Sequence, residues 1–412
     1  MNNNPLSESF ALANGQVIKN RLFKSAMSEQ LGDKHHNPTS GLVTLYQRWA
    51  QGGVGLSMTG NIMVDRTALG EPNNVVLDEQ SDLAIFKQWA KAGKQNDAQI
   101  WAQLNHPGKQ IPKFLCAEPV APSAISLEGG LKKSFNTPRE LTENEIYGII
   151  NKFALSAKLA KQVGFTGVQI HGAHGYLVSQ FLSSRHNQRE DMWGGSLENR
   201  LRFVLELYQA IRNQVGLDFP IGIKLNSADF MKGGFTEEES MQVVQALSNQ
   251  GIDLVEISGG TYENPSMMGS DGKKIKESTL KREAYFIDYM VKVRELVSTP
   301  LVVTGGFRSG PAMNEALTTS ATDFIGIART MAVDPEFPNK LMADPSYGMP
   351  LTTPTTGKPK LDKSSMVGLI WYEHQMWRIA AGKDSDPKLS ALGVVAKTFL
   401  SIGWRAFKKR RA

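Results

Sequence analysis

The feature that most constrains the fold is a regular alternation of short apolar segments with longer segments of helical period. Eight segments predict strands: residues 21–27, 55–59, 98–104, 167–170, 221–225, 254–257, 301–303 and 324–327. Between them, the spacing of apolar residues predicts helices over residues 42–51, 82–95, 143–163, 197–215, 237–249 and 283–297. Thr142 with Glu145, and Thr236 with Glu239, form capping boxes that open two of these helices. This alternation is typical of an α/β protein with a parallel sheet.

Eight such units close naturally into a (β/α)8 TIM barrel, and an open doubly wound sheet is the alternative. No strand is followed by the Gly-x-Gly-x-x-Gly fingerprint of an open dinucleotide-binding sheet. Polar residues and glycines instead follow many different strands, as in a barrel whose site lies at one face. We therefore predict a barrel over residues 1–345 and a helical extension over 346–412, with long loops at 105–139 and 259–280 as lids.

The single cysteine, Cys116, cannot form an internal disulfide, a thiolate zinc site or a cysteine-ligated cluster. Any redox chemistry must therefore come from a cofactor. The first residues show no secretory signal, and no apolar run approaches the ~18 residues of a membrane span. We predict a cytoplasmic protein.

The charge of +6 is concentrated at one end of the chain. Residues 393–412 hold six of the 46 Lys and Arg residues and no acid, which leaves 40 basic and 40 acidic residues over 1–392. The main body is therefore not expected to bind nucleic acid.

The basic end predicts an amphipathic helix, preceded by another helix over 370–381. One face of the last helix carries Leu392, Val395, Phe399, Ile402 and Ala406. This tail could dock on the barrel or on a partner subunit of a homo-oligomer, or it could make a peripheral contact with an anionic membrane.

The densest group of chemically capable side chains is His171-Gly-Ala-His174-Gly-Tyr176, directly after the strand 167–170. Two imidazoles suit the binding of one carbonyl or phenolate oxygen, and a phenol is a suitable acid for protonating a carbon. Zinc would need further ligands at a fixed spacing, so we predict no metal. The alternative is that these residues only pack.

Two further polar residues end predicted strands. The carboxamide of Gln103 can donate and accept hydrogen bonds toward a planar heterocycle, or it can bond loop backbone. Lys224 can stabilise a ring that becomes anionic on reduction, or it can form a salt bridge at the barrel mouth.

Glycine-containing segments follow the last two strands, at 304–308 and 326–329, where barrels commonly hold a phosphate. Arg329 can contact phosphate oxygens in a bidentate manner. Its alternative is an ion pair with a carboxylate such as Asp323 or Asp334.

Together these segments resemble the Old Yellow Enzyme family, which comprises FMN-dependent ene reductases and NADH:flavin oxidoreductases. The resemblance runs over about residues 5–345 and rests on motifs in order at 20–28, 53–56, 103–108, 121–125, 171–177, 193–200 and 282–286. Several motifs in one order are far more specific than any single one.

The resemblance implies that NADH or NADPH reduces a bound FMN, after which the same pocket admits an activated alkene such as an α,β-unsaturated carbonyl. Position by position, it implies FMN contacts from Met27, Ser28, Gly60, Asn61, Gln103, Lys224, Gly305, Gly306, Ala328 and Arg329. It further implies that His171 and His174 hold the substrate oxygen and that Tyr176 protonates the α-carbon.

Three positions depart from the family pattern. Ser28 stands where threonine or cysteine is common, Lys224 where arginine is commoner, and Ala26 where proline is frequent. Serine keeps a donor without a thiol, so we expect a shifted flavin potential. Two other functions remain open: a flavin oxidase or dehydrogenase on the same barrel, and a non-catalytic flavin-binding protein.

Overall fold

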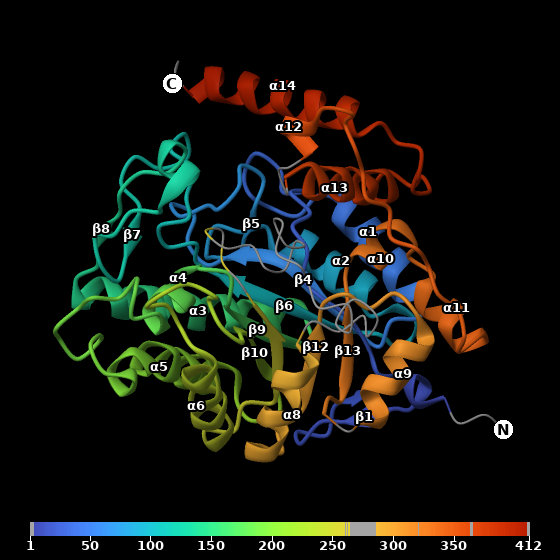
Figure 1. Cartoon of the computed structure of the whole chain (residues 1–412), viewed down its shortest axis with the longest axis horizontal. Helices are drawn as coiled ribbons and strands as arrows, with labels where there is room; N and C mark the ends of the chain where they lie inside the picture. The colour runs from blue at the N-terminus through green and yellow to red at the C-terminus, as the bar shows by residue number, and fades with distance from the viewer. Residues whose placement is uncertain are drawn as a thin grey trace.

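Eight parallel strands pair in chain order and close into a ring. A computed structural model describes residues 4–259, 261, 263, 286–319, 321–362 and 366–409. In it the first barrel strand pairs with both the second and the last, so the sheet closes on itself at the centre of the molecule (Figure 1). The barrel strands are β3 (Leu22–Lys24), β4 (Leu56–Met63), β6 (Gln99–Asn105), β9 (Gly167–Gly172), β10 (Ile221–Asn226), β11 (Leu254–Ser258), β12 (Leu301–Thr304) and β13 (Phe324–Ile327). The predicted TIM barrel is confirmed, and the open sheet is wrong.

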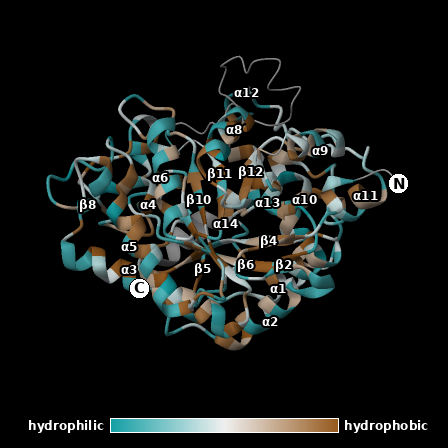
Figure 2. Cartoon of the chain, turned by 90° about the horizontal axis from the view of Figure 1, so that it is seen from below, coloured by the Kyte–Doolittle hydropathy of each residue, from teal (hydrophilic) through white to brown (hydrophobic). Residues whose placement is uncertain are grey.

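Helices follow the strands and surround the barrel (Figure 1). They are α1 (Ser40–Gln51), α2 (Leu83–Gly93), α3 (Glu143–Val163), α4 (Leu177–Leu182), α5 (Leu197–Val215), α6 (Glu237–Asn249), α8 (Ile287–Leu296), α9 (Gly310–Thr318), α10 (Arg329–Val333) and α11 (Phe337–Ala343). Both predicted capping boxes form, at the starts of α3 and α6. The strands are apolar and the helices turn polar faces outward (Figure 2), because the helices bury one stripe each against the barrel.

Some predicted boundaries differ from the structure. The first strand was expected over 21–27 but ends at Lys24, because the residues after it leave the ladder to line the barrel mouth. The second extends to Met63, and the helix expected over 283–297 begins at Ile287 within the described residues. Most of the predicted lid 259–280 and of the motif 282–286 lies outside the described residues.

The amino-terminal end of the barrel is filled by apolar side chains and covered by a hairpin, β1 (Phe10–Ala11) with β2 (Val17–Ile18). The indole of Trp101 lies inside the barrel and donates to Gln16 of this hairpin at 3.1 Å. A Cβ at Gly167 would lie 2.5 Å from the Trp101 ring, so only glycine fits there. With this end closed, a ligand can enter only at the carboxyl ends of the strands.

Three helices follow the barrel: α12 (Pro359–Asp362), α13 (Met366–Ala380) and α14 (Ala391–Lys409). Helix α13 packs on α1 and α10, and α14 lies along the outer edge of the molecule above α13 (Figure 1). Shorter elements complete the chain: η1 (Pro5–Ser7), β5 (Val75–Val76), η2 (Gln95–Asp97), β7 (Val120–Ala121), η3 (Gly129–Lys133) and β8 (Arg139–Glu140). Within the described ranges, none of the helices combines the length and apolar composition that a membrane crossing requires.

Candidate active site

A layer of polar side chains crosses the barrel interior above the apolar floor. Gln103 donates its Nε2 to Gln169 at 2.7 Å, and Gln169 donates to Glu256 at 2.9 Å. Glu256 also accepts from Thr304 at 2.8 Å and pairs with the Lys224 ammonium at 3.0 Å. These residues come from β6, β9, β10, β11 and β12, so one network ties five strands together. The Nε2 of Gln103 already donates a hydrogen bond inside this network. Its side-chain oxygen is therefore the atom suited to accept a hydrogen bond from a ligand.

The ion pair of Lys224 with Glu256 is almost fully buried, with side-chain exposures of 2% and 0%. The predicted salt bridge at the mouth therefore forms, but it lies within the barrel. A buried cation is tolerated only when its partner and further hydrogen bonds replace water. Glu256 meets this requirement because its two oxygens accept three hydrogen bonds or ion-pair contacts.

His171, His174 and Tyr176 come together at the end of β9. The His171 ring lies edge-on to both others, with centroid distances of 5.1 Å to His174 and 4.8 Å to Tyr176. The His174 backbone has a φ of 62°, an uncommon left-handed conformation for a residue with a side chain. Its amide donates to Asn226 at 3.1 Å, and its carbonyl accepts from Gln110 at 3.0 Å. The strained turn is thus held from both sides, which brings the three rings together.

Both imidazoles are held neutral. Burial, with the Lys224 ammonium nearby, lowers the pKa of His171 and His174 well below the ordinary value. The Nδ1 of His171 accepts from the Ala173 amide at 3.3 Å, which assigns its proton to Nε2. A neutral imidazole of this kind is a hydrogen-bond donor toward a polarised oxygen.

The segment after β3 turns against β4 at the barrel mouth. The amide of Gly60 donates to Glu29 at 3.1 Å and to the Tyr46 hydroxyl at 3.1 Å. A Cβ at Gly60 would lie 2.3 Å from the carbonyl oxygen of Met27, so a side chain cannot fit there. Ser28 donates to Glu71 on the loop after β4. Met27 therefore lies against Gly60, and Ser28 lines the same small cavity as Gly60.

Helix α13 brings a further carboxyl group to this mouth. Gln30 donates to Glu373 at 3.1 Å, and the indole of Trp377 donates to the Glu29 carbonyl at 2.7 Å. Burial, together with the neighbouring carboxylate of Glu71, raises the pKa of Glu373 to about 8. Burial also raises the pKa of Glu71. The extension therefore completes the wall of the barrel mouth beside Ser28.

Substitution of this carboxyl group should change how stability depends on pH. The pKa of Glu373 is raised from 4.5 in the unfolded chain to about 8, so the folded protein holds a proton that the unfolded chain releases. The stabilisation that the protonated Glu373 gives the folded protein is complete below pH 4.5, and it is lost as the pH rises to about 8. We expect the melting temperature of Glu373→Gln, relative to the parent, to rise by about 2 °C or more between pH 5 and 9.

Thermal unfolding over that pH range checks this expectation. Glu79→Gln, at an exposed glutamate, is the matched control and should show a constant difference. A constant difference for Glu373→Gln as well would show that the carboxyl group is ionised throughout.

Arg329 begins α10, directly after β13, and its side chain has no ion pair or hydrogen bond among the described residues. The two carboxylates that were considered as ion-pair partners of Arg329 pair with other residues. Asp323 pairs with Arg294, and Asp334 pairs with Lys340 at 2.5 Å. Arg329 is therefore available for an anion.

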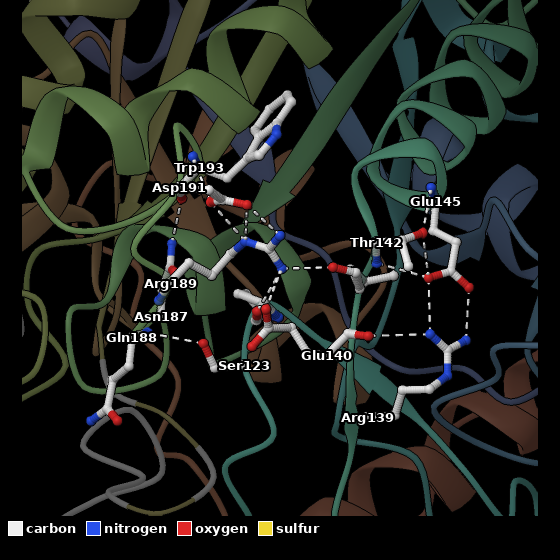
Figure 3. A network of polar contacts seen from close by, with 12 residues as sticks. Ser123, Arg139, Glu140, Thr142, Glu145, Asn187, Gln188, Arg189, Asp191 and Trp193 are labelled. Atoms are coloured by element: carbon white, nitrogen blue, oxygen red, sulfur yellow. Dashed lines mark hydrogen bonds and ion pairs between the residues drawn. The ribbon is translucent and has the colours of Figure 1, made fainter.

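The loop after β6 is anchored at its base by Arg189 (Figure 3). Its guanidinium donates to the carbonyl oxygens of Pro122 and Leu141 at 3.0 and 2.6 Å, and it pairs with Asp191 at 2.6 Å. Ser123 accepts from the Gln188 amide at 3.0 Å. The predicted lid 105–139 is therefore tied to the segment that follows the His and Tyr residues, and its action as a lid stays a prediction.

Comparison with known proteins decides the family. The sequence matches the NADH:flavin oxidoreductase / NADH oxidase family over residues 6–345. The chain belongs to this family. The NADH-dependent flavin oxidoreductase iliE of Hypocrea jecorina is 37% identical over 347 residues, which cover 80% of this chain and 86% of that protein. The NADH oxidase of Thermoanaerobacter brockii is 33% identical over 79% of this chain, which spans about half (48%) of that protein.

Solved structures agree on the fold of the family. The old yellow enzyme homologue from Zymomonas mobilis superposes with a TM-score of 0.71 at 22% identity, over 87% of this chain and 99% of that chain. Morphinone reductase superposes with a TM-score of 0.70 at 23% identity, over 84% and 92%. Membership of the flavin oxidoreductase family identifies FMN as the cofactor and a reduced nicotinamide as its reductant.

The residues present fit FMN. Several side-chain polar atoms at the carboxyl ends of the strands are buried without a hydrogen-bond partner among the described residues: those of Asn61, Asn105, Ser227 and Thr330. Buried polar groups are normally paired, so such atoms indicate a ligand. Gly305 and Gly306 have φ values of 135° and 91°, so their backbone can approach a phosphate more closely than a residue with a side chain.

The ten predicted FMN residues all lie on or directly after barrel strands, near the carboxyl end. Met27 and Ser28 follow β3, Gly60 and Asn61 lie on β4, and Gln103 and Lys224 lie on β6 and β10. Gly305 and Gly306 follow β12, and Ala328 and Arg329 follow β13. Their individual contacts with FMN stay predictions.

The sequence analysis did not predict several residues of the candidate site, notably Gln169, Glu256, Glu29 and Glu71. A signal existed for Glu256, since an acid within the apolar segment 254–257 is costly to bury and needs a partner. No comparable local signal marks Glu29 or Glu71, whose partners come from distant segments.

Proposed function

We propose that the protein is an alkene reductase that acts on α,β-unsaturated carbonyl compounds, with His171 and His174 as the oxygen-binding pair and Tyr176 as the proton donor. The family assignment supplies the flavin oxidoreductase chemistry. The observation that carries the finer proposal is the packing of two neutral imidazoles and a phenol against one another at the end of β9.

FMN, when bound, supplies hydride transfer from NADH or NADPH to the β-carbon of the alkene. The two imidazoles donate hydrogen bonds to the carbonyl oxygen as it gains negative charge, which stabilises the enolate-like transition state. Because they are neutral, they polarise the oxygen without delivering a proton to it. Tyr176 is 6% exposed, so its phenol is largely shielded from water. This phenol gives its proton to the α-carbon.

Product analysis tests this function. The FMN-loaded protein is incubated under argon with NADH or NADPH and cyclohexenone, and the organic product is identified. The proposal expects saturated ketone in proportion to the nicotinamide consumed. Formation of hydrogen peroxide in air with no saturated ketone would favour the oxidase, and no consumption of either nicotinamide would favour a binding protein.

Phenol binding tests the oxygen-binding role separately. A phenolate placed over an oxidised flavin gives a long-wavelength absorption band, which can be titrated. We expect His171→Ala to raise the dissociation constant of a phenol by about tenfold or more, because a donor to a charged oxygen is lost. His35→Ala, at an exposed histidine, is the control. An unchanged affinity in His171→Ala would contradict the role.

A further inference from the structure

Helices α12 to α14 together carry many exposed apolar side chains. Six large apolar side chains on these helices are at least 38% exposed: Leu361, Met366, Leu369, Leu392, Phe399 and Leu400. They are six of the fourteen such side chains in the described part of the chain, although they come from residues 361–400 alone. Where such side chains lie on one face of a helix, they mark an interaction surface.

Over its described side chains, residues 391–400, helix α14 packs on α13 with one face. The indole of Trp371 donates to the Leu389 carbonyl at 2.8 Å, and His374 contacts the Thr398 hydroxyl at 3.0 Å. The buried residues of this face are Ala391, Val394 and Val395. The single apolar face expected from the sequence is therefore divided, because Val395 is buried while Leu392 and Phe399 are exposed. The side chains of Ile402 and Ala406, which were expected on the same face, lie outside those that the structure describes.

A second apolar stripe faces away from the protein. Its positions follow the helix spacing i, i+4, i+7 and i+8, and all are exposed: Leu392, Ala396, Phe399 and Leu400. Phe399 is 55% and Leu400 is 75% exposed. Because these residues are neighbours on one face of a helix, their exposed side chains form a patch, and an apolar patch marks an interaction surface where a single exposed residue does not.

The charge of the tail indicates what that partner is. Residues 358–412 contain twelve Lys and Arg residues against four Asp and Glu residues, a net charge of +8. The remaining 34 basic and 36 acidic residues give the rest of the chain a net charge of −2. The positive charge is therefore concentrated in the segment that carries the exposed apolar stripe.

We propose that α14 is a peripheral membrane-docking helix that lies flat on an anionic lipid surface. Its 19 residues span about 28 Å, and its exposed stripe would enter the boundary between headgroups and acyl chains. The exposed Lys397 on the same helix would contact the anionic headgroups, a contact worth roughly a few-fold in affinity.

Two other occupants suit the surface less well. A nucleic acid offers phosphates for the basic residues but no apolar phase for Phe399 and Leu400. A second copy of the chain, related by a two-fold axis, would bring two segments of charge +8 against each other. An anionic lipid surface offers headgroups for the basic residues and an apolar phase for the exposed stripe.

Sedimentation with vesicles tests the proposal on the full FMN-loaded chain. We expect binding to vesicles of phosphatidylcholine mixed with phosphatidylglycerol, and binding about tenfold or more weaker to phosphatidylcholine alone or at high salt. The double variant Phe399→Glu/Leu400→Glu should lose about tenfold or more in affinity while its reductase activity is unchanged. Leu217→Glu, at a leucine that is 82% exposed outside the tail, should bind like the parent.

Other outcomes would overturn the proposal. The parent chain could fail to bind vesicles, or the double variant could bind them as tightly as the parent. The parent could also bind phosphatidylcholine vesicles as tightly as the anionic vesicles. If the parent instead sediments as a dimer that the double variant converts to a monomer, without vesicle binding, the surface is an interface between copies. None of these results depends on which substrate the enzyme reduces.

Discussion

Tyr176→Phe should slow the reoxidation of the reduced flavin by an enone about 100-fold or more, and it should leave reduction by nicotinamide nearly unchanged. The phenol lies 4.8 Å, ring centre to ring centre, from His171, one of the two proposed oxygen-binding residues. Phenylalanine keeps the ring and its packing while removing the proton. Only the half-reaction that delivers a proton to carbon should respond.

Anaerobic stopped-flow absorbance measures the two half-reactions separately. The buried Tyr208, whose hydroxyl donates to backbone carbonyls of Gln250 and Gly251 away from the site, provides the control Tyr208→Phe. This control should leave both rates near the parent values. Equal slowing of both half-reactions in Tyr176→Phe would indicate a general distortion, and no slowing would remove Tyr176 from the role of acid.

Glu256→Gln should lower the free energy of unfolding by about 3–5 kcal/mol. Glu256 pairs with Lys224 at 3.0 Å inside the barrel, where neither side chain reaches water. The variant keeps the size of the side chain but leaves the Lys224 ammonium without a counter-charge. An uncompensated buried charge is among the most costly defects a core can contain.

Denaturant unfolding of the FMN-saturated variants measures this loss. The double variant Glu256→Gln/Lys224→Met should recover most of it, since no unpaired charge then remains. The exposed pair of Lys292 with Glu237 at 3.4 Å gives the comparison, and Glu237→Gln should cost less than about 1 kcal/mol. A small loss in Glu256→Gln, with no recovery in the double variant, would contradict this account of the buried ion pair.

The barrel could be predicted because its signals are local. Strand and helix periods repeat along the chain, and capping residues such as Thr142 and Thr236 mark helix starts with a side-chain bond that spans three residues. The His171 to Tyr176 group could be predicted for the same reason, since it directly follows one strand. The closing of the ring then brings the predicted residues to one face.

The rest of the site depends on contacts between distant segments, which no local pattern specifies. Gln30 meets Glu373 across 343 positions, and Gln103 meets Gln169 across 66. The sequence predicts that residues around Glu373 form a helix, but not that this helix reaches the mouth beside Ser28. The raised pKa of Glu373 follows from that long-range packing alone.

The most direct test of the central claim is the colour of the purified protein during one anaerobic cycle. The account predicts a yellow protein with one FMN per chain, which bleaches on addition of NADH or NADPH and regains its colour when an enone is added. A colourless protein that does not bind FMN, or a bleached flavin that the enone leaves unchanged, would contradict it.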